Sequence, residues 1–496
     1  MAAINRVVLT GRLTRDPELR TTPTGKQVVN FSIAVQKRVK PQGDEPDAHF
    51  IRCVAWGTSA EFLSNYATKG RLVAIDGRLD QRRYKGSDGV DRDVVEVVAE
   101  SVSLLDRPRD QQDTSTDNHA DEPFPEEIPS GDYDPFAEEE KVMPERLDDL
   151  NFVRKHDPSK MWDLTTGFPH QCREALEIAS KTDLPGGLSG KSNIVLAGMG
   201  GSAAGGDLLK ALLESYSGVP CTVVRDYTIP KFVSDKTLFF ACSYSGNTEE
   251  TMSATELAKQ AGANIVCITS GGRLSEFAEE NELPIITIPG GQPPRTALGY
   301  LFLPAVWVVA RLGYIPEPDF EGAISVLEQC RDQWAPESPQ SKNPTKSLAL
   351  RLFGRIPIIY GLGGWQGYVA QRWKSQINEN AKIMAFAHVF PEMNHNEIVG
   401  WTLADRQNAA HWATVILESG TESKKMIARA QITMDIIRDK TEIYTAFARG
   451  ERMLAQMLSL TYFGDFVSMY LAALYETDPE KIDSIVKLKN ALADIV

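Results

Sequence analysis

Hydrophobic and polar residues alternate along the first hundred residues of the chain, in short runs separated by turn residues. A period of two is typical of β-strands with one buried face. One stretch, Ser59–Gly70, has helical spacing and ends on a glycine suited to a C-cap. Five strands with a helix after the third predict a small closed barrel of the OB type, with the strands in RVVLTGRLT, VVNFSIAVQKR, FIRCVAW, RLVAIDGRL and VVEVVAESVSLL.

The pattern changes after Met143. A helical segment comes first, and continuous apolar strands such as NIVLAGMG, TLFFACS, ANIVCITS and LPIITIP then alternate with helices. Such strands, buried on both faces, indicate parallel sheets covered by helices on both sides. The segment IPIIYGLGGWQGYVAQRW repeats the order of NIVLAGMGGSAAGGDLLK: strand, glycine-rich turn, helix. We therefore expect two related α/β halves, at about 190–320 and 350–496.

Between these regions the periodicity disappears. Residues 107–142 hold 12 acidic and 3 basic side chains, whereas residues 1–106 hold 14 acidic and 16 basic side chains. Few apolar groups remain there to offset the entropy of ordering, so the segment is predicted to be a disordered acidic linker. The expected organisation is a barrel at 1–106, the linker at 107–142, a first α/β domain with its preceding helices at 143–330, and a second at 331–496.

Composition sets broad limits on the class of protein. With 496 residues, 42% hydrophobic and 24% charged, the chain is expected to form about three globular domains. The run Tyr300–Ala310 is too short for a membrane span, and the start of the chain lacks the apolar core of a signal peptide, so we expect a cytoplasmic protein. The six cysteines form no CxxC pair and lie mostly within apolar runs, which favours buried reduced thiols.

Basic and aromatic residues are interleaved in the predicted barrel. Single-stranded nucleic acid is bound by basic grooves together with aromatic rings on which bases stack. The alternative is that Phe50 and Trp56, on one face of a strand, belong to the core. The candidate residues for contact with DNA are Arg6, Lys37, Arg38, Phe50, Arg52, Trp56, Arg82 and Tyr84.

The whole barrel region resembles the bacterial single-stranded DNA-binding protein family, in the blocks INRVVLTGRLTRDPELRTTPTGKQVVNFSIAV, FIRCVAWGTSAEFLSNYATKGRLVAIDGRL and DRDVVEVVAESVSLL. The resemblance implies that Phe50, Trp56 and Tyr84 stack on bases, with Phe50 and Tyr84 replacing the family's usual tryptophans. Near Lys37 and Arg38, where the family often carries a further aromatic, only charge remains. Binding is therefore expected to depend more on phosphate contacts and to weaken steeply with salt.

Two turns in the first α/β half have the composition of a phosphate site. GMGGSAAGGD follows an apolar strand and opens a helix, and ACSYSGNTEET places hydroxyls at a strand-to-helix turn. Dinucleotide binding is a competing interpretation of the first turn, but the GxGxxG spacing fails at Ala203 and no suitably placed acidic residue follows. A helix N-cap would explain one of the hydroxyls in the second turn. The candidate phosphate ligands are Gly201, Ser202, Ser243, Ser245 and Thr248.

A carboxylate and a histidine in the second half could act as a general base and a general acid. Glu379 ends a helical run and His395 lies in an Asn- and Glu-rich loop, although single residues of these types are more often surface residues. Five ordered motifs, GMGGSA, SYSGNTEET, PRTALGY, NENAK and PEMNHNEIVGW, resemble the bifunctional phosphoglucose/phosphomannose isomerase family of two sugar isomerase (SIS) domains. The resemblance extends from about Met143 to the C-terminus.

The resemblance implies a metal-free, cofactor-free aldose–ketose isomerisation of glucose 6-phosphate and fructose 6-phosphate, with mannose 6-phosphate as a further expected substrate. Glu379 would move a proton between C1 and C2 through a cis-enediol, and Arg295 would stabilise the enediolate. His395, reaching in from a partner subunit, would assist ring opening. A lysine near the C-terminus would act at the ring oxygen; Lys489 is chosen over Lys487, and Glu392 and Glu397 are ranked as orienting groups.

The two resemblances also imply partners. Relatives of the barrel are usually tetramers and relatives of the isomerase are dimers, so a homo-oligomer is expected. An alternative function is a SIS-based sugar-phosphate sensor that modulates DNA binding without catalysis. The acidic motif from Asp132 to Phe136 resembles the tip through which single-stranded DNA-binding proteins recruit replication and repair partners, but here it lacks a free carboxylate after Phe136.

Overall fold

The computed structural model describes residues 5–22, 27–37, 48–85, 91–104 and 146–493. The predicted linker, the acidic motif from Asp132 to Phe136, and Arg38 lie outside the described residues. Contacts divide the chain into two compact units, Met1–Val142 and Met143–Val496.

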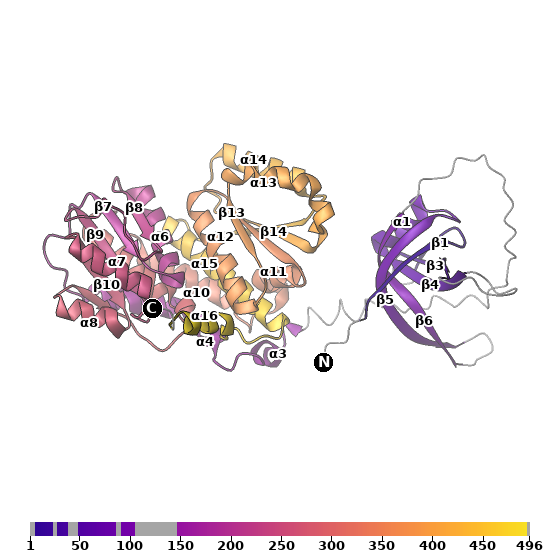
Figure 1. Cartoon of the computed structure of the whole chain (residues 1–496), viewed down its shortest axis with the longest axis horizontal. Coiled ribbons are helices and arrows are strands. Elements are labelled where there is room, and N and C mark those ends of the chain that lie inside the picture. Colours follow the sequence, from indigo (N-terminus) through magenta and orange to yellow (C-terminus); the bar gives the residue numbers. More distant parts are fainter. Residues whose placement is uncertain (1–4, 23–26, 38–47, 86–90, 105–145, 494–496) are drawn as a thin grey trace. The chain divides into compact units, whose positions relative to one another are not determined.

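The N-terminal unit is the predicted OB barrel. A single sheet of order β1-β5-β6-β4-β3-β2 closes through an additional β1–β3 pairing (Figure 1). The helix α1, Gly57–Tyr66, follows β4 and ends four residues earlier than expected, because Ala67 is already extended and Gly70 forms the next turn at φ 87°. The strands are β1 (Val7–Leu13), β2 (Leu19–Thr21), β3 (Gln27–Gln36), β4 (Ala48–Trp56), β5 (Leu72–Lys85) and β6 (Asp91–Leu104).

The long strand β5 contains a bulge. The register between β5 and β6 shifts at Asp76/Gly77. A Cβ at Gly77 would lie 2.0 Å from the carbonyl oxygen of Val98, so only glycine fits this approach of the two backbones. The alternating apolar residues fill the interior, and Cys53 among them is buried, which raises the pKa of its thiol to about 12.

The C-terminal unit contains two parallel sheets, as the alternation of strands and helices predicts. The first has the order β11-β10-β9-β7-β8 and the second β13-β12-β14-β15. The strands are β7 (Asn193–Ala197), β8 (Cys221–Val224), β9 (Thr237–Ser243), β10 (Asn264–Thr269), β11 (Ile285–Thr287), β12 (Ile356–Gly361), β13 (Phe386–Val389), β14 (Trp412–Glu418) and β15 (Glu442–Phe447). The sequence patterns singled out β7, β9, β10, β11 and β12, but not β8, β13, β14 or β15.

Helices cover both faces of each sheet (Figure 1). Before and around the first sheet lie α3 (Leu150–Arg154), α4 (Met161–Thr166), α5 (Phe168–Ser180), α6 (Gly200–Tyr216), α7 (Glu249–Gln260), α8 (Gly272–Glu280), η1 (Pro294–Thr296), α9 (Leu298–Arg311) and α10 (Phe320–Trp334). The second half contains η2 (Gln340–Lys342), α11 (Pro344–Leu352), α12 (Gly364–Gln376), η3 (Ile377–Ala381), η4 (Glu392–Asn394), α13 (Glu397–Gly400), η5 (Trp401–Gln407), η6 (Ala409–His411), α14 (Lys424–Ile437), α15 (Met453–Leu474) and α16 (Asp483–Ala493).

The two halves share one hydrophobic core. Strand residues alternate in direction, so Ile194 and Leu196 of β7 face the shared core while Val195 and Ala197 face the helices on the other side. The helix α15 fills the centre and packs against α10, α11 and α12. By length and composition α15 could cross a membrane, but 94% of its apolar window is buried inside the unit, where it serves as the core helix.

All six cysteines are free and buried, as predicted from their apolar surroundings. Burial raises the pKa of each thiol, to about 12 at Cys221, Cys267 and Cys330. Thiols in such surroundings remain protonated at neutral pH, so they are poor nucleophiles and poor metal ligands. Their role is packing.

Candidate functional site

The two predicted phosphate turns meet at one edge of the first sheet. Strands β7 and β9 are parallel neighbours, so the turns that follow them lie side by side. Because β8 pairs with the other side of β7, this is the point where the strand order reverses, and ligands of open α/β sheets bind at such points. Ser202, in the first turn of α6, is 4% exposed, and Ser243 ends β9 at 1% exposed.

Hydroxyls and backbone N–H groups converge in the turn after β9. Ser243 Oγ lies 2.9 Å from Thr248 Oγ1 and accepts a hydrogen bond of 3.1 Å from the N–H of Gly246. Gly246 has φ +69°, and a Cβ there would lie 1.8 Å from the carbonyl oxygen of Gly271, so the turn requires glycine. Ser245 is exposed at the tip. The helix α7 begins directly afterwards and directs its first N–H groups toward this turn.

Arg295 and Glu379 form the second part of the site, although 84 positions of the sequence separate them. Arg295 is on η1 and only 5% exposed. Its Nη1 lies 3.5 Å from Oε2 of Glu379, its Nε donates to Asn380 Oδ1 at 2.8 Å, and its Nη2 donates to the carbonyl of Pro479 at 2.6 Å. Burial lowers the pKa of Arg295, and the nearby carboxylate of Glu379 acts in the opposite direction.

The two parts of the site are in contact through the backbone. A Cβ on Gly201, next to Ser202, would lie 2.8 Å from the carbonyl oxygen of Pro294 and 3.5 Å from Cα of Arg295. The absence of a side chain at Gly201 therefore lets the start of α6 lie against η1. The turn that carries the phosphate candidates and the turn that carries the buried arginine are thereby adjacent.

A buried polar network supports Arg295 from behind. Arg372 of α12 donates from Nη2 to the carbonyl of Arg295 at 3.2 Å and to Asp465 of α15 at 2.9 Å. Burial raises the pKa of Asp465, while Arg372 and a hydrogen bond from Gln376 favour its charged form. Sequence reasoning missed this network. The available signal was the single acidic residue Asp465 in the otherwise apolar segment of α15, since a buried charged group needs a partner.

Glu379 is placed by an unusual turn. The helix α12 continues into the π-helix η3, and single π-turns often occur at functional sites. Lys382 follows in the left-handed region at φ 59°. Its Nζ donates to the carbonyls of Glu379 at 2.8 Å, Asp478 at 2.5 Å and Pro479 at 2.9 Å. Burial, and then the charge of Arg295, lower the pKa of Lys382 to about 8.

His395 and Lys489 are not joined to this cluster within the chain. His395 follows η4 and is exposed, and in the described residues no hydrogen bond or ion pair links it to Arg295 or Glu379. Its loop is anchored elsewhere: Glu397 accepts a hydrogen bond of 2.5 Å from Tyr360. Lys487 and Lys489 are exposed on α16.

The DNA-binding candidates are divided by their surroundings. Phe50 on β4 is 54% exposed, so it is not a core residue, whereas Trp56 packs partly against Val28, Val54 and Val98. Phe50 and Arg52 border a hollow of about 420 Å³. The charge of Arg6 is compensated by ion pairs with Asp76 and Glu100, and Lys37 is half-buried after β3. Arg82 and Tyr84 lie in β5, but their side chains are outside the described part of the structure.

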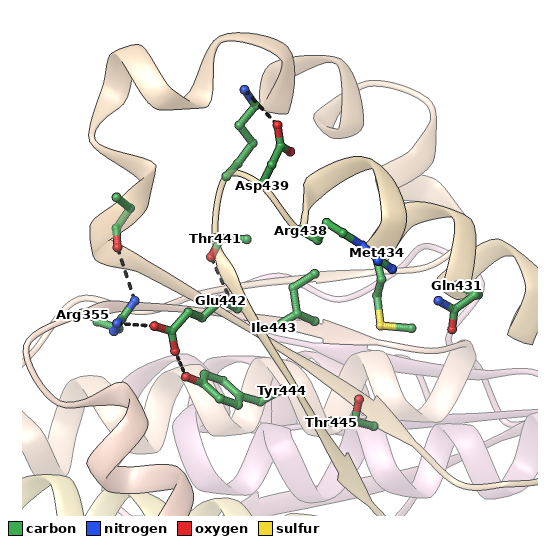
Figure 2. Close-up of a pocket in the computed structure, with 12 residues that line it drawn as sticks. Arg355, Gln431, Met434, Arg438, Asp439, Thr441, Glu442, Ile443, Tyr444 and Thr445 are labelled. Carbon is green, nitrogen blue, oxygen red and sulfur yellow. Dashed lines mark hydrogen bonds and ion pairs between the residues drawn. The ribbon is translucent and has the colours of Figure 1, made fainter. Parts of the chain in front are cut away.

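A larger hollow of about 730 Å³ lies along the edge strand β15 and the end of α14 (Figure 2). Within it, Arg355 pairs with Glu442 at 2.6 Å, and Glu442 also accepts a hydrogen bond from Tyr444. None of the predicted phosphate or catalytic residues lines it. In the described residues, no group of three His, Cys, Asp or Glu side chains could hold a metal ion.

Comparison with known proteins connects these features to families. Over 338 residues, 68% of this chain and 99% of the relative, the sequence is 42% identical to a bifunctional phosphoglucose/phosphomannose isomerase from Caldicellulosiruptor bescii. A relative of the same description from Thermoplasma acidophilum is 39% identical over 61% of this chain and 90% of its own length. The chain belongs to the bifunctional phosphoglucose/phosphomannose isomerase family.

Family models match the isomerase at two places: the SIS domain at 187–293 and the bacterial phospho-glucose isomerase C-terminal SIS domain at 341–492. The single-strand binding protein family matches 4–105. Over 23% of this chain and 71% of the relative, the sequence is 50% identical to a single-stranded DNA-binding protein from Oceanobacillus iheyensis. This member of the isomerase family is therefore fused to a domain of the single-strand binding family.

The fold of the isomerase unit also occurs in solved structures. The crystal structure of a hypothetical protein from Thermus thermophilus aligns with a TM-score of 0.56 at 16% identity, over 72% of this chain and 95% of that one. At this identity the similarity concerns the fold alone. It agrees with the two α/β sheets described above.

Proposed function

We propose that the unit Met143–Val496 interconverts glucose 6-phosphate, fructose 6-phosphate and mannose 6-phosphate, and that the barrel binds single-stranded DNA. The isomerase proposal rests on the ion pair of Arg295 with Glu379, 3.5 Å apart. This pair lies beside a turn rich in hydroxyl and N–H donors. A sensor of sugar phosphates needs the donors only. A carboxylate beside a buried arginine adds a base and a positive charge that can stabilise an anionic intermediate. Proton transfer needs both, so we favour catalysis over sensing.

In the proposed mechanism the sugar phosphate is held by Ser202, Ser243, Ser245 and Thr248. Glu379 removes the proton from C2 of the aldose and returns it to C1, which gives the ketose through a cis-enediol. The negative charge that develops on the sugar oxygens lies close to the guanidinium of Arg295. Hydrogen bonds from Nε and Nη2 to protein groups fix the orientation of this guanidinium, so little reorganisation is needed when the charge appears.

His395 fits a role in a partner subunit. Its loop is anchored by the hydrogen bond between Glu397 and Tyr360, and exposed apolar side chains occur in the segments that precede and follow it in the sequence. These side chains are between 51% and 67% exposed: Met384, Phe386, Val399 and Leu403. Association of two copies through this surface would bury them and present His395 to the neighbouring site, as a dimer requires. Lys489, on exposed α16, is proposed to act at the ring oxygen after similar docking.

The barrel is proposed to bind single strands through Phe50, Trp56 and Tyr84 with the basic candidates around them. The half-exposed ring of Phe50 supports this proposal because it borders the same hollow as Arg52. A base could stack on the ring while Arg52 contacts a neighbouring phosphate. The six buried free thiols are consistent with a cytoplasmic location, which we also propose.

The isomerase assignment is tested with coupled assays on both sugar phosphates, using the full chain. Replacement Glu379→Gln removes the base and is expected to lower kcat about 10²–10⁴-fold with little change in KM. The matched control is Glu256→Gln, an exposed carboxylate on α7. Wild-type rates in Glu379→Gln would reject Glu379 as the base. An inactive wild-type protein that binds the sugar phosphates would favour the sensor.

A further inference from the structure

The second sheet repeats the connectivity of the first. In the order β8-β7-β9-β10 each strand has a counterpart in β13-β12-β14-β15, with β7 matching β12 and β9 matching β14. Figure 1 shows the two sheets in neighbouring parts of the same unit. A glycine-rich turn and a helix follow both β7 and β12. The counterpart of Ser202, third in α6, is Gln366, third in α12.

The turn after β14 corresponds to the phosphate turn after β9, and a carboxylate of the chain occupies it. Glu422 Oε1 accepts hydrogen bonds from the N–H of Ser419 at 2.5 Å, from Ser419 Oγ at 2.7 Å and from Gln366 Nε2 at 2.8 Å. Oε2 accepts from the N–H of Gly420 at 2.9 Å. Gln366 is 4% exposed and Ser419 9% exposed. Donors from both turns thus converge on one anion, as they would on an oxyanion ligand.

Glu422 does not serve as the cap of its own helix. That role belongs to Ser423, which accepts a hydrogen bond of 3.2 Å from the N–H of Met426 at the start of α14. Burial alone would raise the pKa of Glu422, but the hydrogen bonds from Ser419 and Gly420 outweigh it and hold the pKa below its ordinary value. The side chain is therefore a carboxylate at neutral pH, and every donor of the turn named above is committed to it.

We propose that the second half has retained an anion site equivalent to the sugar-phosphate turn of the first half, and that the carboxylate of Glu422 occupies this site as an internal substitute for a phosphate monoester. The native chain then has one monoester site although it has two SIS halves. Removal of the Glu422 side chain leaves the donors of Ser419, Gly420 and Gln366 free to hold a monoester. The equivalence rests on the function proposed above for the first half.

The test counts binding sites on the full chain by calorimetry with glucitol 6-phosphate, which lacks the carbonyl needed for turnover. Wild-type protein is expected to bind one molecule per chain, and Glu422→Gly and Glu422→Ser are expected to bind two. Adding Gln366→Leu to Glu422→Gly should abolish the second site. The control is Glu418→Ser, which removes a half-buried carboxylate four residues earlier; it should still bind one.

The possible failures can be told apart. No binding to the wild type, with one molecule bound by each Glu422 variant, would reject the first-half site and support the second. One molecule bound by the wild type and by both variants would overturn the inference. Stability provides an independent measurement, since inorganic phosphate should raise the melting temperature of Glu422→Gly more than that of the wild type. A destabilised variant that phosphate does not restore would also overturn the inference.

Discussion

The guanidinium of Arg295 lies 3.5 Å from the carboxylate of Glu379, with its other nitrogens held by Asn380 and by the carbonyls of Pro479 and Glu480. The geometry leaves one side of the guanidinium facing the proposed base. A substrate between the turns of the first sheet and Glu379 would meet this side. The guanidinium of Arg295 that pairs with Glu379 is therefore placed to receive the charge of the proposed enediolate.

The variant Arg295→Lys should show how much the positive charge and how much the hydrogen-bond geometry of Arg295 contribute to catalysis. Lysine keeps the positive charge but cannot bond Asn380 and two carbonyls through a planar fork, so we expect kcat to fall about 10²–10³-fold. The carbonyls left without donors should also lower the free energy of unfolding, by about 1–3 kcal/mol. Steady-state rates and chemical denaturation measure the two effects. The control is Arg331→Lys, at a partly exposed arginine that pairs with Asp332; equal losses in both variants would contradict the prediction.

Lys382 is expected to position the base without touching the substrate. Its ammonium ties the π-turn of Glu379 to the carbonyls of Asp478 and Pro479, so Lys382→Met should lower kcat more than it changes KM. Lys382→Arg should restore part of the rate, because a guanidinium can still donate to these carbonyls. Lys374→Met on α12 is the control. A rise in KM with unchanged kcat would instead place Lys382 in substrate binding.

The pKa of Lys382 predicts how stability depends on pH. The folded value of about 8 lies below the unfolded value of 10.5, so the unfolded chain holds the additional proton between these two pH values. Stability of the wild type relative to Lys382→Met should therefore rise as pH increases from 8 to 10.5. Denaturation of both proteins across this range measures it. A relative stability that falls with pH would show that the amine has a raised pKa.

Phe50 should contribute stacking energy to DNA binding. Phe50→Ala is expected to weaken binding of single-stranded DNA by about 1–3 kcal/mol, and Phe50→Trp should retain or strengthen it, since either aromatic ring offers a face to a base. Fluorescence titration at fixed salt measures the affinities. Equal affinities of the wild type and both variants for DNA would show that the half-exposed ring of Phe50 does not contact the DNA. The dependence on salt should stay unchanged, because no phosphate contact is lost.

The two functions are expected to be independent. The units have separate cores, and the residues that carry each proposed site lie within one unit. Saturating fructose 6-phosphate should therefore leave the affinity for single-stranded DNA unchanged in the full chain. A change in affinity that disappears in Ser243→Ala, where a phosphate ligand is lost, would instead support the sensor.

Local pattern predicted more of the fold than of the site. Alternation of apolar and polar residues along the strands predicted the barrel, and continuous apolar strands that alternate with helices predicted the parallel sheets. The turn of Ser243 and Thr248 was visible because its residues lie within a few positions. The bonds from Lys382 to the carbonyls of Asp478 and Pro479 were not visible, because these groups lie almost a hundred residues away and any sequence provides carbonyls. The link of Glu397 to Tyr360, a strand residue, was hidden for the same reason. Which residues meet across the core depends on tertiary packing, which spacing does not encode.

The position of α15 has a consequence for synthesis of the protein. Trp162 of α4 packs on Phe466 and Tyr470 of α15, and Tyr462 donates to the carbonyl of Thr165. The first half of the isomerase therefore cannot complete its core until nearly the whole chain has left the ribosome. The barrel has all its strands once residue 104 has emerged. A nascent chain still attached to the ribosome would then carry a finished DNA-binding domain well before it carries an enzyme.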